Sequence, residues 1–240
     1  LQEHFCELGA SKQAFAQVLG VYQSPQGDES LIATLASYFR RECAWDIGPR
    51  NIAVVNGSQT AFFYLLNFFA GQDSSGKKRK VLLPLVPEYL GYADQGVEAD
   101  IFSPCKPLIN ILSDNRFEYR CDFDRMESIS DIGAVCISRP TNPSGNVIPD
   151  CDVKHLSDFA AQVGCPLIID GAYGKPFPGL IYGDEKPYWD ENSIVVMSTS
   201  KLGLPGVRTG VIVANEDVIN YVTRANTIIS LASGGLGSFL

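Results

Sequence analysis

The chain has 240 residues, of which 45% are hydrophobic and 19% charged, so it can bury a sizeable core and is too apolar to be disordered. Its formal net charge of -8 argues against binding to nucleic acid, which requires a basic face. The apolar run at 61–70 is too short to cross a membrane and is expected to be a buried helix. Seven cysteines without a C-x-x-C pair favour a reduced, cytoplasmic protein, and with only two histidines no metal site is expected.

The region 1–48 is expected to form a helical lead-in, because Leu31, Leu35, Tyr38 and Phe39 recur at helical spacing. From residue 49 onward, short apolar runs typical of buried strands alternate with longer helical patterns. The expected strands are 52–55, 81–84, 134–138, 166–170, 193–197 and 210–214, and the expected helices are 30–41, 58–70, 88–95, 151–162 and 216–229. This alternation predicts an α/β fold with a mostly parallel central sheet and helices on both faces.

Four polar clusters follow predicted strands directly. They are Asn-Gly-Ser-Gln at 56–59, Arg-Pro-Thr-Asn-Pro-Ser-Gly at 139–145, Gly-Ala-Tyr-Gly at 171–174 and Ser-Thr-Ser-Lys at 198–201. Ligands of parallel α/β sheets bind at the carboxyl ends of the strands. The sequence therefore predicts a binding site at one edge of the sheet, although each cluster alone is typical of an ordinary turn or helix cap.

The chemistry of these clusters suits an aromatic, phosphorylated cofactor. Ser58 begins a helix whose free N-H groups suit a phosphate. Asp170 closes an apolar strand, where a carboxylate needs a partner such as a protonated ring nitrogen, and Tyr173 could bond an oxygen on the same ring. Lys201 could act as a nucleophile toward a carbonyl, with Arg208 supplying positive charge and binding a phosphate, and Ser198 and Ser200 adding hydroxyl donors.

Two further residues complete the candidate set. Asn142 lies in a strong turn signal, and its amide could reach the edge of the cofactor. Tyr89 follows Pro87-Glu88 and could lie flat over an aromatic ring, or it could simply pack in the core or at an interface.

Taken together and in this order, these residues resemble the fold-type I pyridoxal-phosphate enzymes of the aspartate aminotransferase superfamily. The resemblance implies that Lys201 forms a Schiff base with pyridoxal 5'-phosphate and that Arg208 binds its phosphate. It also implies that Asp170 bonds the pyridine nitrogen and that Tyr173 and Asn142 bond the ring hydroxyl. Further implied contacts are ring stacking by Tyr89, phosphate binding by the helix start at Ser58 and Gln59, and a reach by Tyr22 to the phosphate of a partner subunit, hence a homodimer.

The resemblance also carries expectations about domains and substrates. Region 49–240 is expected to be the cofactor-binding large domain, while the C-terminal small domain of the family, with its carboxylate-binding arginine, is expected but absent from this chain. Segments 56–71, 87–96, 138–148 and 200–210 most resemble aminotransferases that exchange an amino group between valine or alanine and 2-oxo acids such as pyruvate.

Three alternatives stay open at this stage. A lyase that uses the same cofactor has nearly the same residues. A cofactor-binding module without full aminotransferase activity fits a fragment or a truncated relative. An α/β domain whose polar loops arise by chance is the third alternative.

Overall fold

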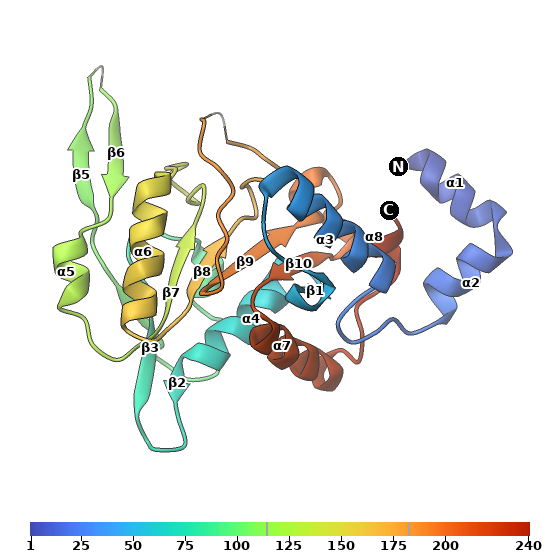
Figure 1. Cartoon of the computed structure of the whole chain (residues 1–240), viewed down its shortest axis with the longest axis horizontal. Coiled ribbons are helices and arrows are strands. Elements are labelled where there is room, and N and C mark those ends of the chain that lie inside the picture. The colour runs from blue at the N-terminus through green and yellow to red at the C-terminus, as the bar shows by residue number, and fades with distance from the viewer. Residues whose placement is uncertain (114, 182) are drawn as a thin grey trace. The chain divides into compact units, whose positions relative to one another are not determined.

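The computed structural model describes residues 1–113, 115–181 and 183–240 (Figure 1). These residues form two compact units. The first unit joins Leu1–Ala61 to Met197–Leu240, and the second is the continuous segment Phe62–Val196.

The first unit is mainly helical. Its helices are α1 (Gln2–Ala10), α2 (Lys12–Gly20), α3 (Glu29–Cys43), α7 (Glu216–Ile229) and α8 (Leu236–Phe239), together with the 3-10 turns η1 (Pro49–Asn51), η3 (Thr199–Leu202) and η4 (Pro205–Val207). α3 begins at Asp28, whose carboxylate accepts the N-H of Leu31 at 2.8 Å, which satisfies a free donor of the first turn. It ends at Ala44, whose φ of 55° is left-handed.

Two strands of the first unit pair antiparallel. These are β1 (Ile52–Val55) and β10 (Gly210–Val213), with Ile52 opposite Val213 and Val55 opposite Gly210. All eight residues are buried, which explains why both strands read as continuous apolar runs. α3 and α7 both contact β1 and cover it.

The second unit holds a mostly parallel sheet. β3 (Lys78–Leu83), β7 (Ile132–Ser138), β8 (Leu167–Asp170) and β9 (Ser193–Ser198) pair in that order and are all parallel, and the last two residues of β9 are counted in the first unit. β4 (Phe102–Pro104) adds to β3 in parallel, and β2 (Gly71–Gln72) adds to it antiparallel. The register places Ser138 opposite Asp170 and Asp170 opposite Val196, so the carboxyl ends of β7 and β8 lie level. α6 (Asp150–Gln162) packs on β7 and β8.

A β-hairpin and a short helix complete the second unit. The hairpin pairs β5 (Leu108–Ile111) with β6 (Phe117–Arg120) and projects beside α6, above α5 (Phe123–Glu127) (Figure 1). Its apolar side chains are largely exposed, with Ile111 75% and Phe117 55% accessible. No strand is predicted from the sequence in this segment.

The sequence predictions of the buried elements are confirmed, with one exception. The strands all lie where they were expected, as do the helices at α3, α4 (Ser58–Phe69), α6 and α7. The expected helix at 88–95 is wrong, because only the 3-10 turn η2 (Leu90–Tyr92) forms there. The ring of Tyr89 lies over Gly91. Because glycine is a poor helix former, the segment forms no α-helix. Among the described residues, no helix is long and apolar enough to cross a membrane.

Candidate functional site

In the first unit, the turn after β1 brings a cation to the start of α4. Gly57 has a φ of 86°, which glycine adopts without strain, and the guanidinium of Arg208 lies directly against it, where a Cβ atom would overlap Nη2. Gly210 approaches the same turn, since a Cβ atom there would lie 2.6 Å from the N atom of Ser58. Two residues without side chains therefore let Arg208 and the first turn of α4 lie close together.

The segment that follows β9 adds hydroxyls and an amine to this turn. The hydroxyl of Ser198 accepts the N-H of Ser200 at 3.1 Å and so caps the 3-10 turn η3, which carries Lys201. Nη1 of Arg208 donates to the hydroxyl of Ser200 at 3.4 Å and to the carbonyl of Pro205 at 3.3 Å. Lys201 and Arg208 are both exposed.

This group of the first unit, made of Gly57, Ser58, Ser198, Ser200 and Arg208, has the donors that a phosphate needs. A helix start offers N-H groups and the positive end of the helix dipole, and an arginine offers a planar fork of N-H donors. Gln59 lies exposed on the first turn of α4. Tyr22, two residues after the end of α2, is 82% exposed and forms no hydrogen bond with a described residue of this group.

In the second unit, Asp170 ends β8 as a buried carboxylate with only 7% of its surface accessible. Oδ2 accepts the hydroxyl of Tyr92 at 2.6 Å, and Oδ1 accepts the N-H of Ala172 at 2.9 Å. Burial raises the pKa of Asp170, while these two hydrogen bonds oppose the rise. Each carboxylate oxygen has two lone pairs, so the group can still accept a further donor.

The segment after β3 carries residues that sequence reasoning missed. Tyr92 is buried and its ring contacts that of Tyr89 edge to face at 5.4 Å, which orients the residue expected to stack on the cofactor. Glu88 accepts the N-H of Ser138 at 2.9 Å and also its hydroxyl. The sequence does contain a signal for Glu88, since it is an acidic residue inside the apolar stretch at 81–92. A carboxylate in such a stretch requires hydrogen-bond partners.

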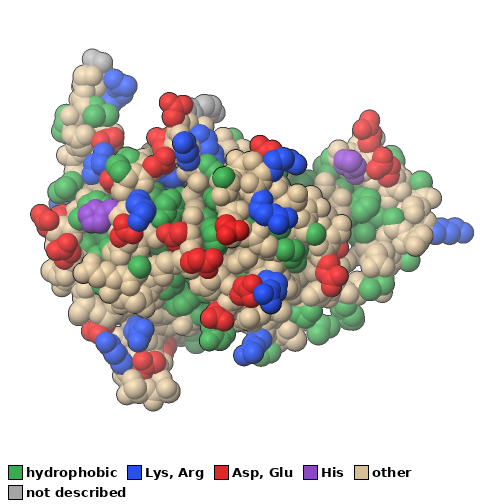
Figure 2. Space-filling view, in the orientation of Figure 1, with side chains coloured by type: hydrophobic (Ala, Val, Ile, Leu, Met, Phe, Trp, Pro, Cys, Tyr) green, Lys and Arg blue, Asp and Glu red, His purple; other side chains and the backbone are tan. Residues whose placement is uncertain are grey.

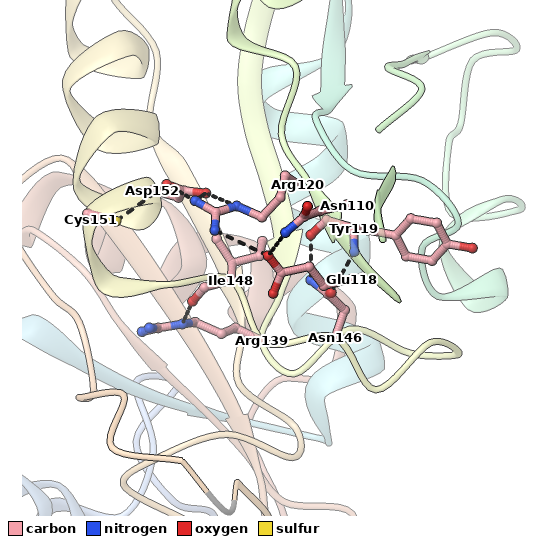
Figure 3. A network of polar contacts seen from close by, with 9 residues as sticks. All are labelled: Asn110, Glu118, Tyr119, Arg120, Arg139, Asn146, Ile148, Cys151 and Asp152. Carbon is pink, nitrogen blue, oxygen red and sulfur yellow. Dashed lines mark hydrogen bonds and ion pairs between the residues drawn. The ribbon is translucent and has the colours of Figure 1, made fainter. Parts of the chain in front are cut away.

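The loop that carries Asn142 is held from several sides (Figure 3). Asn146 pairs with the backbone of Tyr119 on β6, accepting its N-H at 2.9 Å and donating to its carbonyl at 3.1 Å. The buried Arg139 donates from Nε to the carbonyl of Ile148 at 2.7 Å and forms an ion pair with Asp150 at the start of α6. The loop is therefore fixed at both ends.

The same network extends to the hairpin. The guanidinium of Arg120 meets both carboxylate oxygens of Asp152 at 3.1 Å, and Glu118 joins it to Asn110 across the hairpin (Figure 3). The side-chain amide of Asn142 has no hydrogen-bond partner among the described residues. Tyr173 lies in the turn after β8, where its carbonyl accepts the N-H of Leu180 at 2.9 Å, and its side chain is partly exposed.

The structure thus brings the predicted residues together in two groups, one in each unit. A cationic, hydroxyl-rich group lies at the start of α4, and a group containing a buried carboxylate, a tyrosine and an amide lies at the ends of β7 and β8. The chain belongs to the class I and II aminotransferase family, whose model matches residues 8–237. Its fold is the α/β fold of the fold-type I pyridoxal-phosphate enzymes.

Particular aminotransferases resemble the chain closely. Valine-pyruvate aminotransferase of Escherichia coli K12 is 51% identical over 216 residues, which are 90% of this chain and 52% of that protein. The crystal structure of a Psychrobacter arcticum protein assigned as an amino-acid aminotransferase superposes with a TM-score of 0.95 at 41% identity, over 99% of this chain and 58% of that one. The crystal structure of valine-pyruvate aminotransferase from Salmonella typhimurium LT2 gives 0.89 at 45% identity, over 99% and 59%. The chain therefore spans a little over half the length of these relatives.

Proposed function

We propose that the protein takes part in pyridoxal-phosphate-dependent transamination between valine or alanine and a 2-oxo acid such as pyruvate. The observation that carries the proposal is the pair of residue groups described above, in a chain whose relatives are named as valine-pyruvate aminotransferases. A lyase is less well supported, because these relatives are named for transfer of an amino group.

The residues present fit this cofactor. The guanidinium of Arg208, seated on Gly57, with the hydroxyls of Ser198 and Ser200 and the helix start at Ser58 and Gln59, would hold a phosphate dianion. The buried carboxylate of Asp170 would gain from a cationic partner, because burial raises its pKa and an opposite charge lowers it. Tyr173 and the amide of Asn142 would bond the ring oxygen, and Tyr89 would cover the ring face.

Bound pyridoxal phosphate supplies an aldehyde that reacts with amines and a ring that accepts electrons from the substrate α-carbon. The amine of Lys201 would hold the cofactor at its aldehyde carbon, and as a base it would take the proton from the substrate α-carbon. The carboxylate of Asp170 would keep a proton on the ring nitrogen, and this charge favours electron withdrawal. Asn142 would also orient the substrate carboxylate.

Two further expectations belong to this proposal. A homodimer is supported by the exposed apolar side chains Phe5, Phe15 and Leu19 on α1 and α2 (Figure 2), and Tyr22 would then reach the phosphate in the partner subunit. A cytoplasmic location is consistent with seven free cysteines.

The test is to purify the chain with pyridoxal phosphate, reduce it with borohydride and locate the modified lysine by mass spectrometry. We expect a visible absorbance band and modification at Lys201, both lost in Lys201→Ala and both kept in the control Lys154→Ala on α6. Amino transfer from valine to pyruvate is followed as alanine formed, and we expect Asp170→Ala to lower its rate by roughly two orders of magnitude. A colourless protein, modification of another lysine, or an unchanged rate in Asp170→Ala would overturn the proposal. Release of ammonia in place of alanine would favour the lyase.

A further inference from the structure

Glu88 occupies a place where the sheet lacks a strand partner. β3 pairs with β7 from Lys80 to Leu82 and ends at Leu83, whereas β7 continues to Ser138. The N-H of Ser138 is therefore beyond the reach of the β3 ladder, and Oε1 of Glu88 accepts it at 2.9 Å in place of a backbone carbonyl. The Glu88 side chain thus extends the hydrogen bonding of β7 to its last residue.

The contact continues from Ser138 to Asn142. The Ser138 hydroxyl bonds to Oε2 of Glu88 and accepts the N-H of Asn142 at 3.4 Å, while its carbonyl accepts the hydroxyl of Thr141 at 3.0 Å. Tyr92 donates its hydroxyl to Asp170, which ends the neighbouring strand β8. One short segment after β3 therefore holds two of the residues assigned to the cofactor, Asn142 through Ser138 and Asp170 through Tyr92.

The carboxyl groups of Glu88 and Asp170 lie at the same sheet edge and disfavour each other's ionisation. Burial raises the pKa of Glu88 to about 8, the two hydrogen bonds from Ser138 oppose this rise, and the charge of Asp170 adds to it. Among the described residues, the other titratable groups that interact with Glu88 include Tyr92, Cys136 on β7 and Cys121 after β6, none of which is cationic. At neutral pH these surroundings favour a proton on Glu88.

We propose that Glu88 is a positioning residue that fixes the Asn142 loop through Ser138 as a neutral carboxylic acid, which leaves the negative charge at this edge to Asp170. This inference rests on the proposed function, since it assigns Asn142 and Asp170 to the cofactor. Because a neutral Glu88 carries no charge, it would not weaken the interaction between the carboxylate of Asp170 and the protonated ring nitrogen.

The first test needs no cofactor. The chain is labelled with glutamate carrying ¹³C at the side-chain carboxyl, and the Glu88 signal is assigned by its loss in Glu88→Gln. We expect it to titrate near 8, whereas an exposed glutamate titrates at about 4.3. Because the folded state then holds a proton that the unfolded state releases, thermal stability falls as the pH rises from about 4 to 8, and Glu88→Gln removes this part of the fall. A Glu88 midpoint below about 6 overturns the inference.

The second test measures the affinity of the apoprotein for pyridoxal phosphate by absorbance titration at pH 7. Glutamine is neutral, and its amide can accept the N-H of Ser138 and donate to its hydroxyl, so Glu88→Gln should bind within about threefold of the original chain. Glu88→Leu removes both hydrogen bonds and should bind about tenfold or more weakly. Glu127→Gln, on the exposed end of α5, is the matched control for loss of a carboxylate.

The outcomes separate the two proposals. If the original chain binds no pyridoxal phosphate but Glu88 titrates near 8, the proposed function fails and the neutral state of Glu88 stands. If the chain binds the cofactor but Glu88→Gln is as weak as Glu88→Leu, a charged Glu88 is required and the inference fails. Thermal unfolding of Glu88→Leu checks that this variant is folded. If Glu88→Leu binds pyridoxal phosphate as tightly as the original chain does, a positioning role for Glu88 is excluded.

Discussion

Removing the hydroxyl of Tyr92 tests how the protein holds a buried carboxylate. Tyr92 and Asp170 are 2% and 7% exposed, and their oxygens are 2.6 Å apart. A hydrogen bond to a charged group contributes about 1.5–3 kcal/mol, so Tyr92→Phe should lower the free energy of unfolding by that amount at a pH where Asp170 is ionised. For a chain of this length the melting temperature shifts by about 2–4 °C per kcal/mol, which gives a fall of roughly 3–12 °C.

The loss should depend on pH in one direction. The hydroxyl of Tyr92 favours the ionised form of Asp170, so Tyr92→Phe raises the pKa of this carboxyl further above its ordinary value. Below the unfolded-state pKa of about 3.9 the carboxyl is neutral in both states, and the variant then loses only a neutral hydrogen bond of about 0.5–1.5 kcal/mol. The difference between the variant and the original chain therefore grows as the pH rises through the raised pKa of Asp170.

Thermal unfolding followed by circular dichroism at several pH values measures this difference. Tyr119→Phe is the matched control, because its ring points away from the polar network (Figure 3) and keeps its contact with Phe117 at 5.3 Å. We expect this control to change stability by less than about 0.5 kcal/mol. The reasoning is refuted if Tyr92→Phe is as stable as the control, or if its cost does not grow as the pH rises through the titration of Asp170.

Two further predictions concern other contacts. Gly57→Ala places a Cβ atom on the guanidinium of Arg208 at a residue with a φ of 86°, so it should cost about 1–3 kcal/mol and weaken pyridoxal-phosphate binding about tenfold. Gly164→Ala, at a φ of 75° with open space around it, should show the backbone cost alone, and equal binding by the two variants would contradict the assignment of Arg208. Arg120→Met breaks a partly buried pair with two hydrogen bonds and should cost about 1–3 kcal/mol in urea unfolding. Lys154→Met removes an exposed pair on α6 and should cost less than about 0.5 kcal/mol, so similar losses in the two variants would argue against the structural importance of the Arg120 network.

Much of the fold could be read from local patterns. Strands such as β7 and β8 are buried on both faces and therefore read as unbroken apolar runs, and α7 shows an apolar stripe at helical spacing. The hairpin strands at 108–111 and 117–120 were missed because β5 is exposed and β6 only half-buried, so neither strand has an apolar run like those of the buried strands. The register of the two strands depends on their pairing with one another and on the contact of β6 with Asn146, which is distant in the sequence.

The sequence by itself was enough to identify the candidate site residues, because ligand-binding residues in this class of sheet lie where strands end. The candidates at or after the ends of the predicted strands are Lys201, Asp170, Asn142, Tyr173 and Arg208. Only the tertiary structure decided how the carboxylate of Asp170 is satisfied and what anchors the Asn142 loop. Both answers come from 88–92, a segment predicted to be a helix. Its conformation is set by two hydrogen bonds, one that Glu88 accepts from Ser138 and one that Tyr92 donates to Asp170, partners 50 and 78 positions away. Local propensity contains no information about partners so distant, which is why the sequence indicated the chemistry of the site and the folded chain supplied its support.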